Sequence, residues 1–287
     1  MHILITDSGV GGLSVCAYAE RFVRTHGCKE PVRLTFANAA PENDYGYNAM
    51  PSREVKLETF DRFLGNVVER YAPDFVYVAC NTLSVLLPDT PRARAIPMNG
   101  IVETGVESVM REVEAQPRAA VMIFATQTTI DAGAHVRQLE ARGVAAARIV
   151  AQACPGLADI ISEDREGARA KEAIVKWVSA AIEKLPEAGL PVVACLACTH
   201  YGYRKQRFAD ALAGAGIRAT VVDPNERAVG DMFGAQDAGN HRDVSVELVT
   251  RYALPQTTRD TLTELLGDIS PRTVAAMQSF NHQPALF

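Results

Sequence analysis

The sequence predicts an α/β protein of two pseudo-symmetric domains, each a mostly parallel sheet flanked by helices, with an active site in the interdomain cleft. Short apolar runs typical of buried strands alternate with helical segments, which is the pattern of parallel sheets covered by helices. Landmarks also recur along the chain: 73 positions separate Asp7 from Cys80, and 72 separate Thr126 from Cys198. Each landmark follows a strand-like run, so the spacing indicates a duplicated α/β unit.

The first half of the chain shows this alternation. The segment 54–71 is predicted to be an amphipathic helix, because its apolar residues from Val55 to Tyr71 keep the i, i+3, i+4 rhythm and Pro73 ends it. The polar segment 38–51 is predicted to be a loop that contributes to the site. Strands are expected at 2–6, 32–37, 75–79 and 96–101, and further helices at 12–26 and 104–115.

The second half repeats the pattern. Strands are expected at 119–125, 148–152, 191–196 and 218–222, and helices at 131–142, 165–185 and 204–214. The C-terminal part is less regular, with helices predicted at 225–234 and 258–267 around a β-like segment at 244–252. From about Asn281 the chain is expected to be disordered, as chain ends commonly are.

Composition argues against several classes of protein. The chain has 287 residues, of which 48% are hydrophobic and 22% charged, as in ordinary globular proteins. Its net charge is −5 and it contains no long basic run, which argues against nucleic acid as a partner. No segment is apolar enough to span a membrane and no secretory signal is recognisable, so a cytoplasmic location is expected. The six cysteines should then be reduced thiols used in packing or catalysis.

Two of these cysteines stand out by their position. Cys80 and Cys198 each end an apolar run and precede a predicted helix start, so each lies where open α/β sheets place their ligands. A thiolate is a base and a nucleophile, and a helix N-terminus can lower its pKa. If the two sulfurs face each other across a small pocket, one can remove a proton from a carbon while the other supplies one. Such a pair inverts a stereocentre without a cofactor.

Polar residues near these cysteines are candidates for assisting roles. Asp7 can pair with a substrate amine or tune the Cys80 thiol. His200 can tune the Cys198 thiol or supply its proton. The residues that can grip a substrate carboxylate or stabilise a thiolate are Asn81, Thr82 and Thr199.

Other interpretations of the same residues stay open. The Gly-rich segment from Asp7 to Ser14 is either a small-ligand turn or only a tight strand-to-helix turn, and its spacing fits neither the Walker pattern nor G-x-G-x-x-G. Cys195 and Cys198 form a C-x-x-C pair, but no second pair at zinc spacing accompanies them, so no metal site is expected. Cysteine is also a common core residue, and an Asp after a strand is often only a turn residue.

Five ordered motifs resemble those of one known family. They are Asp7-Ser8-Gly9-Val10-Gly11-Gly12-Leu13-Ser14-Val15, Tyr45-Gly46, Ala79-Cys80-Asn81-Thr82, Ala125-Thr126 with Thr129, and Ala197-Cys198-Thr199-His200-Tyr201. Together they are similar to the PLP-independent glutamate racemases of the aspartate/glutamate racemase superfamily. The resemblance runs from residue 2 to about residue 230.

The resemblance implies an activity and a set of site residues. The expected reaction is the interconversion of L- and D-glutamate by two cysteines at the α-carbon, without a cofactor, supplying D-glutamate for the peptidoglycan of the cell wall. Cys80 and Cys198 would be the acid/base residues, with Asp7 and His200 assisting. The α-carboxylate would be held by Asn81, Thr82 and Thr199, the side-chain carboxylate by Ser8, Tyr45 and Gly46, and the substrate would be fixed further by Thr126.

The resemblance also implies a domain division and a set of partners. Residues 1–97 with 215–287 would form a discontinuous first domain, and residues 98–214 the second. The expected partner is a small-molecule amino acid or small carboxylic acid. A homodimer is compatible with the resemblance, whereas nucleic acid and membrane partners are not expected.

Three departures from the family pattern leave the substrate open. Asp44 replaces the Pro before Tyr45-Gly46, and a like charge there would disfavour glutamate. Gly202 replaces the Pro after Cys-Thr-His-Tyr, and Pro224 replaces the Ser of a late Asp-Ser. The alternatives are therefore a racemase or isomerase of another small acid, such as aspartate or a hydantoin, and a non-catalytic small-acid binding protein. Residues 234–287 show no motif that assigns them a role.

Overall fold

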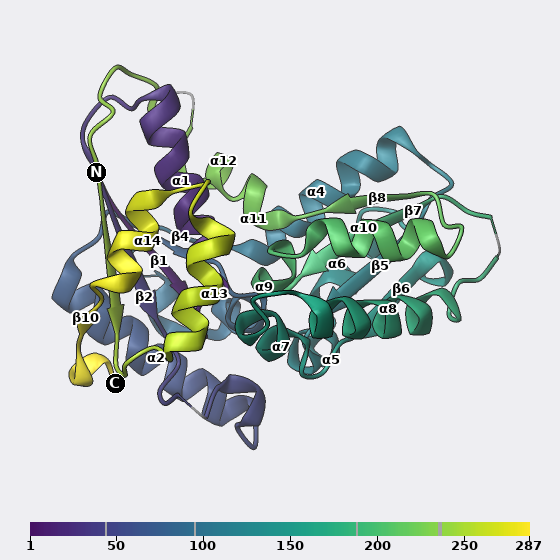
Figure 1. Cartoon of the computed structure of the whole chain (residues 1–287), viewed down its shortest axis with the longest axis horizontal. Helices are drawn as coiled ribbons and strands as arrows, with labels where there is room; N and C mark the ends of the chain where they lie inside the picture. Colours follow the sequence, from purple (N-terminus) through teal and green to yellow (C-terminus); the bar gives the residue numbers. More distant parts are fainter. Residues whose placement is uncertain (44, 95, 188, 235–236) are drawn as a thin grey trace.

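The computed structural model describes residues 1–43, 45–94, 96–187, 189–234 and 237–287. The chain forms two lobes, each built on one parallel sheet with helices against both faces (Figure 1). The predicted two-domain α/β class is confirmed. Both termini lie in the same lobe, which is on the left in Figure 1.

The first lobe contains a six-stranded sheet in the order β10-β9-β2-β1-β3-β4. Every paired neighbour in this sheet is parallel, so all the carboxyl ends of its strands point to one edge. Its strands are β1 (His2–Asp7), β2 (Val32–Asn38), β3 (Phe75–Val78), β4 (Met98–Gly100), β9 (Val244–Thr250) and β10 (Asn281–His282).

Helices bury this sheet on both faces because successive strand residues point in opposite directions. Ile3 and Ile5 face α1 (Leu13–His26), α13 (Gln256–Leu266) and α14 (Pro271–Gln278). Leu4 faces the other way, against α2 (Arg53–Tyr71). Burial on both faces explains the nearly continuous apolar runs of these strands.

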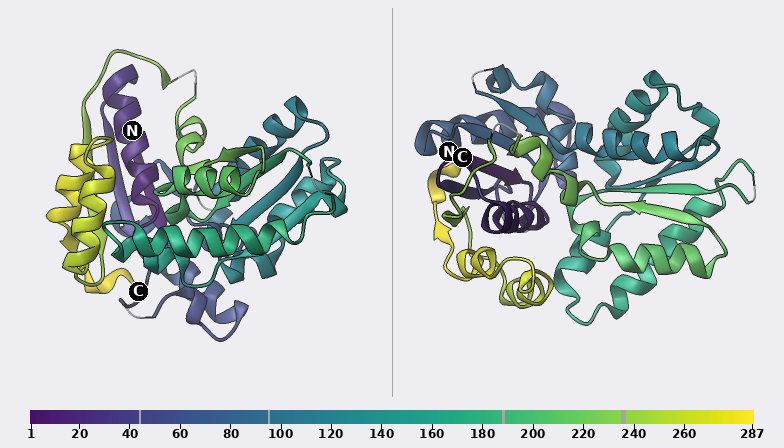
Figure 2. Two further views of the ribbon diagram at one scale, coloured as in Figure 1. Left: turned by 45° about the vertical axis from the view of Figure 1, so that its right-hand side comes forward. Right: turned by 90° about the horizontal axis from the view of Figure 1, so that it is seen from above.

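The second lobe contains a four-stranded parallel sheet in the order β6-β5-β7-β8. Its strands are β5 (Ala120–Ala125), β6 (Ile149–Ala153), β7 (Val192–Ala197) and β8 (Ala219–Val222). One face packs on α4 (Ile101–Ala115) and α6 (Ala134–Ala141). The other packs on α7 (Leu157–Glu163), α8 (Ala168–Ile182) and α10 (Lys205–Gly214) (Figure 2).

The two sheets share one strand order. The run β2-β1-β3-β4 in the first lobe corresponds to β6-β5-β7-β8 in the second. Strand β4 thus belongs to the first sheet and β8 to the second. The expected domain ranges differ from this, because they placed residues 98–100 in the second domain and residues 219–222 in the first. We therefore propose domain limits just after these two strands, near residues 100 and 223.

The remaining helices are short. The helices are α3 (Asn81–Ser84), α5 (Gln127–Ala132), α9 (Thr199–Gly202), α11 (Pro224–Arg227) and α12 (Val229–Met232), and the short 3₁₀ helices are η1 (Tyr47–Ala49), η2 (Leu87–Asp89), η3 (Pro91–Arg94), η4 (Ala146–Arg148) and η6 (Pro284–Leu286). Within the described ranges, no helix is both long and apolar enough to cross a bilayer.

Several element predictions need correction. The helix expected at 131–142 is two helices, because Gly133 between them has φ +62°, a left-handed conformation that glycine tolerates. The helix expected at 165–185 is shorter, and α7 precedes it. The chain from Asn281 is ordered rather than disordered: β10 pairs with β9, and Leu286 is fully buried.

Candidate active site

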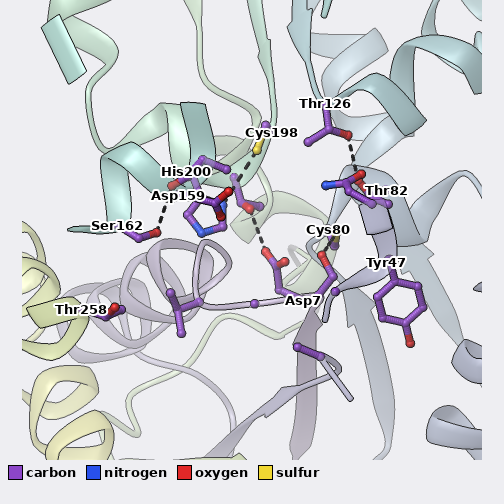
Figure 3. Close-up of a pocket in the computed structure, with 18 of the residues that line it drawn as sticks. Asp7, Tyr47, Cys80, Thr82, Thr126, Asp159, Ser162, Cys198, His200 and Thr258 are labelled. Atoms are coloured by element: carbon purple, nitrogen blue, oxygen red, sulfur yellow. Dashed lines mark hydrogen bonds between the residues drawn. The ribbon is translucent and has the colours of Figure 1, made fainter. Parts of the chain in front are cut away.

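A cavity of about 480 Å³ lies between the two lobes. It is bordered by the residues that end or follow four strands: Asp7 after β1, Cys80 after β3, Thr126 after β5 and Cys198 after β7 (Figure 3). Of the predicted site residues, those that line it are Asp7, Ser8, Gly46, Cys80, Asn81, Thr82, Thr126, Cys198, Thr199 and His200. The duplicated fold thus brings both thiols, one from each lobe, to one cavity.

Tyr45 is the one predicted site residue that the structure does not place in the cavity. Its side chain is 39% exposed, and it is not among the residues that border the cavity. Tyr47 lies there instead, because η1 begins at this residue and its ring packs edge-on against Phe60, with centroids 6.4 Å apart. Asp44, expected to place a charge beside this pocket, lies outside the described residues.

The first thiol, Cys80, is 5% exposed and precedes α3. Its Sγ lies 3.0 Å from Oγ of Ser8, which belongs to the Gly-rich turn. Burial raises the pKa of the Cys80 thiol to about 12, and the negative charge of Asp7 adds to this effect. Hydrogen bonding by Ser8 acts in the opposite direction, since it stabilises the thiolate.

The second thiol, Cys198, is 6% exposed and precedes α9. Its Sγ lies 3.9 Å from Nδ1 of His200. Burial raises its pKa well above the ordinary value, and the charges of Asp7 and Cys80 raise it further, whereas the backbone N–H of His200 opposes the shift. The helix starts were expected to favour thiolates, but burial outweighs that effect at both sulfurs.

Asp7 connects the two lobes at the floor of the site. It is 1% exposed, and its Oδ2 accepts a hydrogen bond of 2.7 Å from Oγ1 of Thr199. The Gly-rich turn allows this approach, because a Cβ on Gly11 would lie 2.7 Å from Cε1 of His200. Burial lowers the pKa of His200, whereas the charges of Asp7 and Asp159 act to raise it.

The side chain of Asn81 is the clearest candidate for binding a ligand in the cavity. It is 3% exposed and borders the cavity, and among the described residues neither its Nδ2 nor its Oδ1 has a hydrogen-bond partner. A buried amide without partners is unfavourable unless a ligand or water satisfies it. Beside it, Oγ1 of Thr82 lies 3.0 Å from Oγ1 of Thr126, a contact between the lobes.

The sequence did not reveal a second wall of the cavity. It comes from α7 and from the segment 252–258 before and at the start of α13, in regions where no motif was found. The residues of this wall are Ala158, Asp159, Ser162, Glu163, Tyr252, Leu254, Pro255 and Thr258. The Pro-Gly pair before α7 was the one local signal of a helix start there.

The charge around the cavity is acidic. Asp7, Glu42, Asp159 and Glu163 border it, and no Lys or Arg is among the bordering residues that the structure describes. Any carboxylate bound here must therefore rely on hydroxyls, backbone N–H groups and the Asn81 amide rather than on a cation.

The remaining cysteines lie in the packed core. In the C-x-x-C pair, Cys195 is fully buried among the apolar residues between β7 and α4, while Cys198 faces the cavity. In the part of the chain that the structure describes, no group of three or more His, Cys, Asp or Glu side chains is placed to hold a metal ion.

Comparisons with known proteins identify the family of this chain. A family model described as Asp/Glu/Hydantoin racemase matches residues 50–232. The glutamate racemase of Desulforudis audaxviator is 28% identical over 76% of this chain and 72% of that protein, and that of Herpetosiphon aurantiacus is 29% identical over 76% and 77%.

Solved structures show the same fold. Glutamate racemase RacE1 from Bacillus anthracis superposes with a TM-score of 0.71 at 19% identity, covering 92% of this chain and 93% of that one. Glutamate racemase from Francisella tularensis, solved in complex with D-glutamate, superposes with a TM-score of 0.69 at 19% identity and the same coverage.

Proposed function

Because this chain belongs to the Asp/Glu/Hydantoin racemase family and is a racemase, an isomerase, we propose that it interconverts L- and D-glutamate by two-cysteine proton transfer. The observation that carries the proposal is the placement of Cys80 and Cys198, from different lobes, on one cavity. The reaction needs no cofactor, since the bases are side chains of the chain itself.

The proposed reaction exchanges one proton for another at the α-carbon. A thiolate on one side takes the α-proton, and the C–H electron pair passes into the carbanion, which the neighbouring carboxylate delocalises. The thiol on the other side then donates its proton to the opposite face, so one S–H bond forms and one breaks. General acid and base groups in such positions each contribute roughly 10²–10⁴-fold to the rate.

Both thiols are neutral at rest because of their raised pKa values, so one of them must be ionised before reaction. Ser8 supports the thiolate of Cys80 by hydrogen bonding, and His200 can accept the proton of Cys198. In one direction Cys198, after giving its proton to His200, takes the α-proton while Cys80 donates its own, which leaves Cys80 as the thiolate that Ser8 stabilises. The reverse reaction starts from that state, with Cys80 as the base and Cys198 as the acid.

Recognition of glutamate is proposed from the polar groups on the cavity. All six of these residues border the cavity, and we propose that Asn81, Thr82 and Thr199 hold the α-carboxylate while Ser8, Gly46 and Thr126 hold the rest of the substrate. We further propose a cytoplasmic role in supplying D-glutamate for peptidoglycan. A homodimer remains a prediction that analytical ultracentrifugation can test.

Exchange with solvent deuterium tests the proposed reaction. In D₂O, without added cofactor, the wild-type protein is expected to place one deuterium on the α-carbon of L- or D-glutamate while the circular dichroism signal decays to zero. Cys80→Ala and Cys198→Ala should each reduce racemisation by about 10²-fold or more. Cys195→Ala is the matched control, because Cys195 lies in the core of the same strand. Full racemisation by Cys80→Ala would refute the two-cysteine reaction.

The acidic lining favours a second candidate substrate. Four carboxylates on the cavity disfavour a doubly charged acid, so a neutral hydantoin is the alternative. A panel of enantiopure glutamate, aspartate and hydantoins, followed by circular dichroism, separates these substrates. Binding of any of them without deuterium uptake would instead indicate a protein that binds small acids without catalysis.

A further inference from the structure

Asn225, in α11, lies at the junction of the two lobes and is 1% exposed. Its Nδ2 donates two hydrogen bonds, one of 2.8 Å to the backbone oxygen of Thr199 and one of 3.0 Å to Oγ of Ser14. Its backbone N–H donates to Oδ1 of Asp223 at 3.0 Å. A backbone carbonyl can only accept, so the donor group of the Asn225 amide must face Thr199.

The two partners of Asn225 belong to the two turns that build the site. Thr199 follows Cys198 directly, and its hydroxyl binds Asp7. Ser14 is the second residue of α1, and its Oγ donates to the backbone oxygen of Gly11 at 3.0 Å, within the Gly-rich turn. The Asn225 amide therefore ties the turn of the second cysteine to the turn that holds Asp7.

Gly202 makes room for this amide. A Cβ at Gly202 would lie 2.8 Å from Nδ2 of Asn225 and 2.9 Å from Cγ of Asp223, which is closer than real Cβ atoms approach. Gly202 and Pro224 are both positions where the sequence departs from the family pattern. The structure brings the two departures together around one buried side chain.

We propose that Asn225 is a positioning residue that sets Cys198 relative to Asp7, acting through Thr199. The inference rests on the proposed reaction, because it assigns Asn225 to the thiol that reacts on the second lobe. Asn225 does not itself border the cavity, and it reaches the site through its hydrogen bond to the backbone oxygen of Thr199. Its loss should therefore displace Cys198 without removing any group that binds substrate, and a misplacement of about 1 Å can reduce a rate by about 10²-fold.

The test compares Asn225→Ala and Asn225→Asp with the wild type. Asp keeps the size of the side chain but presents oxygen to the Thr199 carbonyl. Both variants are expected to lower kcat for glutamate racemisation by about 10- to 100-fold with KM changed by less than about threefold. Gly202→Ala should act in the same direction, by pushing the amide away. Asn99→Ala, at an exposed position of β4, is the control and should match the wild type.

A second readout separates positioning from general loosening. The rates at which iodoacetamide alkylates Cys80 and Cys198 are measured by mass spectrometry of the two peptides. The inference requires that Asn225→Ala changes the rate at Cys198 and leaves that at Cys80 unaltered. Equal changes at both thiols, or wild-type kcat and alkylation, would overturn it. Should the wild type exchange no deuterium, the proposed reaction fails, and the alkylation rates still decide the role of Asn225.

Discussion

At the scale of single residues, the site depends on how burial and one carboxylate set the pKa values of the two thiols. Burial is the main cause of the raised pKa at Cys80 and at Cys198, and the charge of Asp7 raises both. A raised pKa keeps each sulfur protonated at neutral pH, so it can act as an acid. Acting as a base then requires help from Ser8 on one side and His200 on the other.

Removing the charge of Asp7 should lower the pKa of both thiols. In Asp7→Asn, the side chain still accepts from Thr199, but the carboxylate charge is gone. Plots of alkylation rate against pH for Cys80 and Cys198 are therefore expected to move to lower pH. Ser8→Ala is the matched variant of opposite sign: it should move the Cys80 profile to higher pH and leave that of Cys198 in place. Profiles that do not move in Asp7→Asn would show that the charge of Asp7 does not contribute to the pKa of either thiol.

Site residues that follow strand ends could be predicted from the sequence, whereas Tyr45 is a predicted site residue in a loop that the structure does not place in the cavity. Ten predicted residues border the cavity. Most follow the ends of parallel strands, which share an edge of the sheet, whereas Ser8, Gly46 and Thr126 were predicted from the family resemblance. The choice between Tyr45 and Tyr47 depends on packing against Phe60, which a loop sequence does not encode locally. Asn225 was missed for the same reason, since its partners are distant in the chain.

At the scale of elements, strong periodic patterns predicted the long helices and buried strands, whereas the short elements were not predicted. Strand β10 has two residues and η6 has three, so neither is long enough to show a strand or helix periodicity. Their order comes from tertiary contacts: the Phe287 ring lies 5.3 Å from that of Phe63, and Leu286 is buried in the same cluster as α2. These contacts hold the tail against β9, whose end leads into the second wall of the cavity.

Shortening the buried side chain of the tail should destabilise the protein. Leu286 is fully buried, so Leu286→Ala is expected to lower the free energy of unfolding by about 2–5 kcal/mol, measured by urea denaturation. Val175→Ala is the control, because Val175 is 45% exposed and its truncation removes little buried area. A tail that is disordered in solution would instead give Leu286→Ala the stability of the wild type.

At the scale of the whole molecule, the duplication was legible in the spacing of landmarks, and the shared strand order agrees with it. The limits between the two domains are harder to predict, because β4 and β8 have only three and four residues and their sequences do not say which sheet they join. The second wall of the cavity could not be predicted from the sequence either. It combines α7 with the segment 252–258, two parts of the chain that meet only through tertiary packing.

The free energy of unfolding of the whole molecule should depend on pH because of Asp223. Burial raises the pKa of this carboxyl from 3.8 to about 7, so the native state keeps a proton that the unfolded chain has lost. The contribution of Asp223 to the free energy of unfolding therefore falls as pH rises from about 4 to about 7. Asp223→Asn cannot ionise, so its stability relative to the wild type should increase over that range.

Thermal unfolding at several pH values measures this difference. Asp210→Asn is the control, since it makes the same substitution at an exposed position. A difference between Asp223→Asn and the wild type that stays constant from pH 4 to pH 7 would mean that Asp223 titrates normally in the folded protein.

Cys80 and Cys198 come from separate sheets of one chain. A molecule that lacks one thiol therefore cannot borrow it from a second molecule that retains it. Preparations of Cys80→Ala and Cys198→Ala, once mixed, contain every functional group of the intact protein. No single cavity in the mixture holds both thiols, however, unless the molecules trade whole lobes. Complementation in a test tube would thus report lobe exchange between copies, a behaviour opposed by the first lobe, whose sheet is built from both ends of the chain.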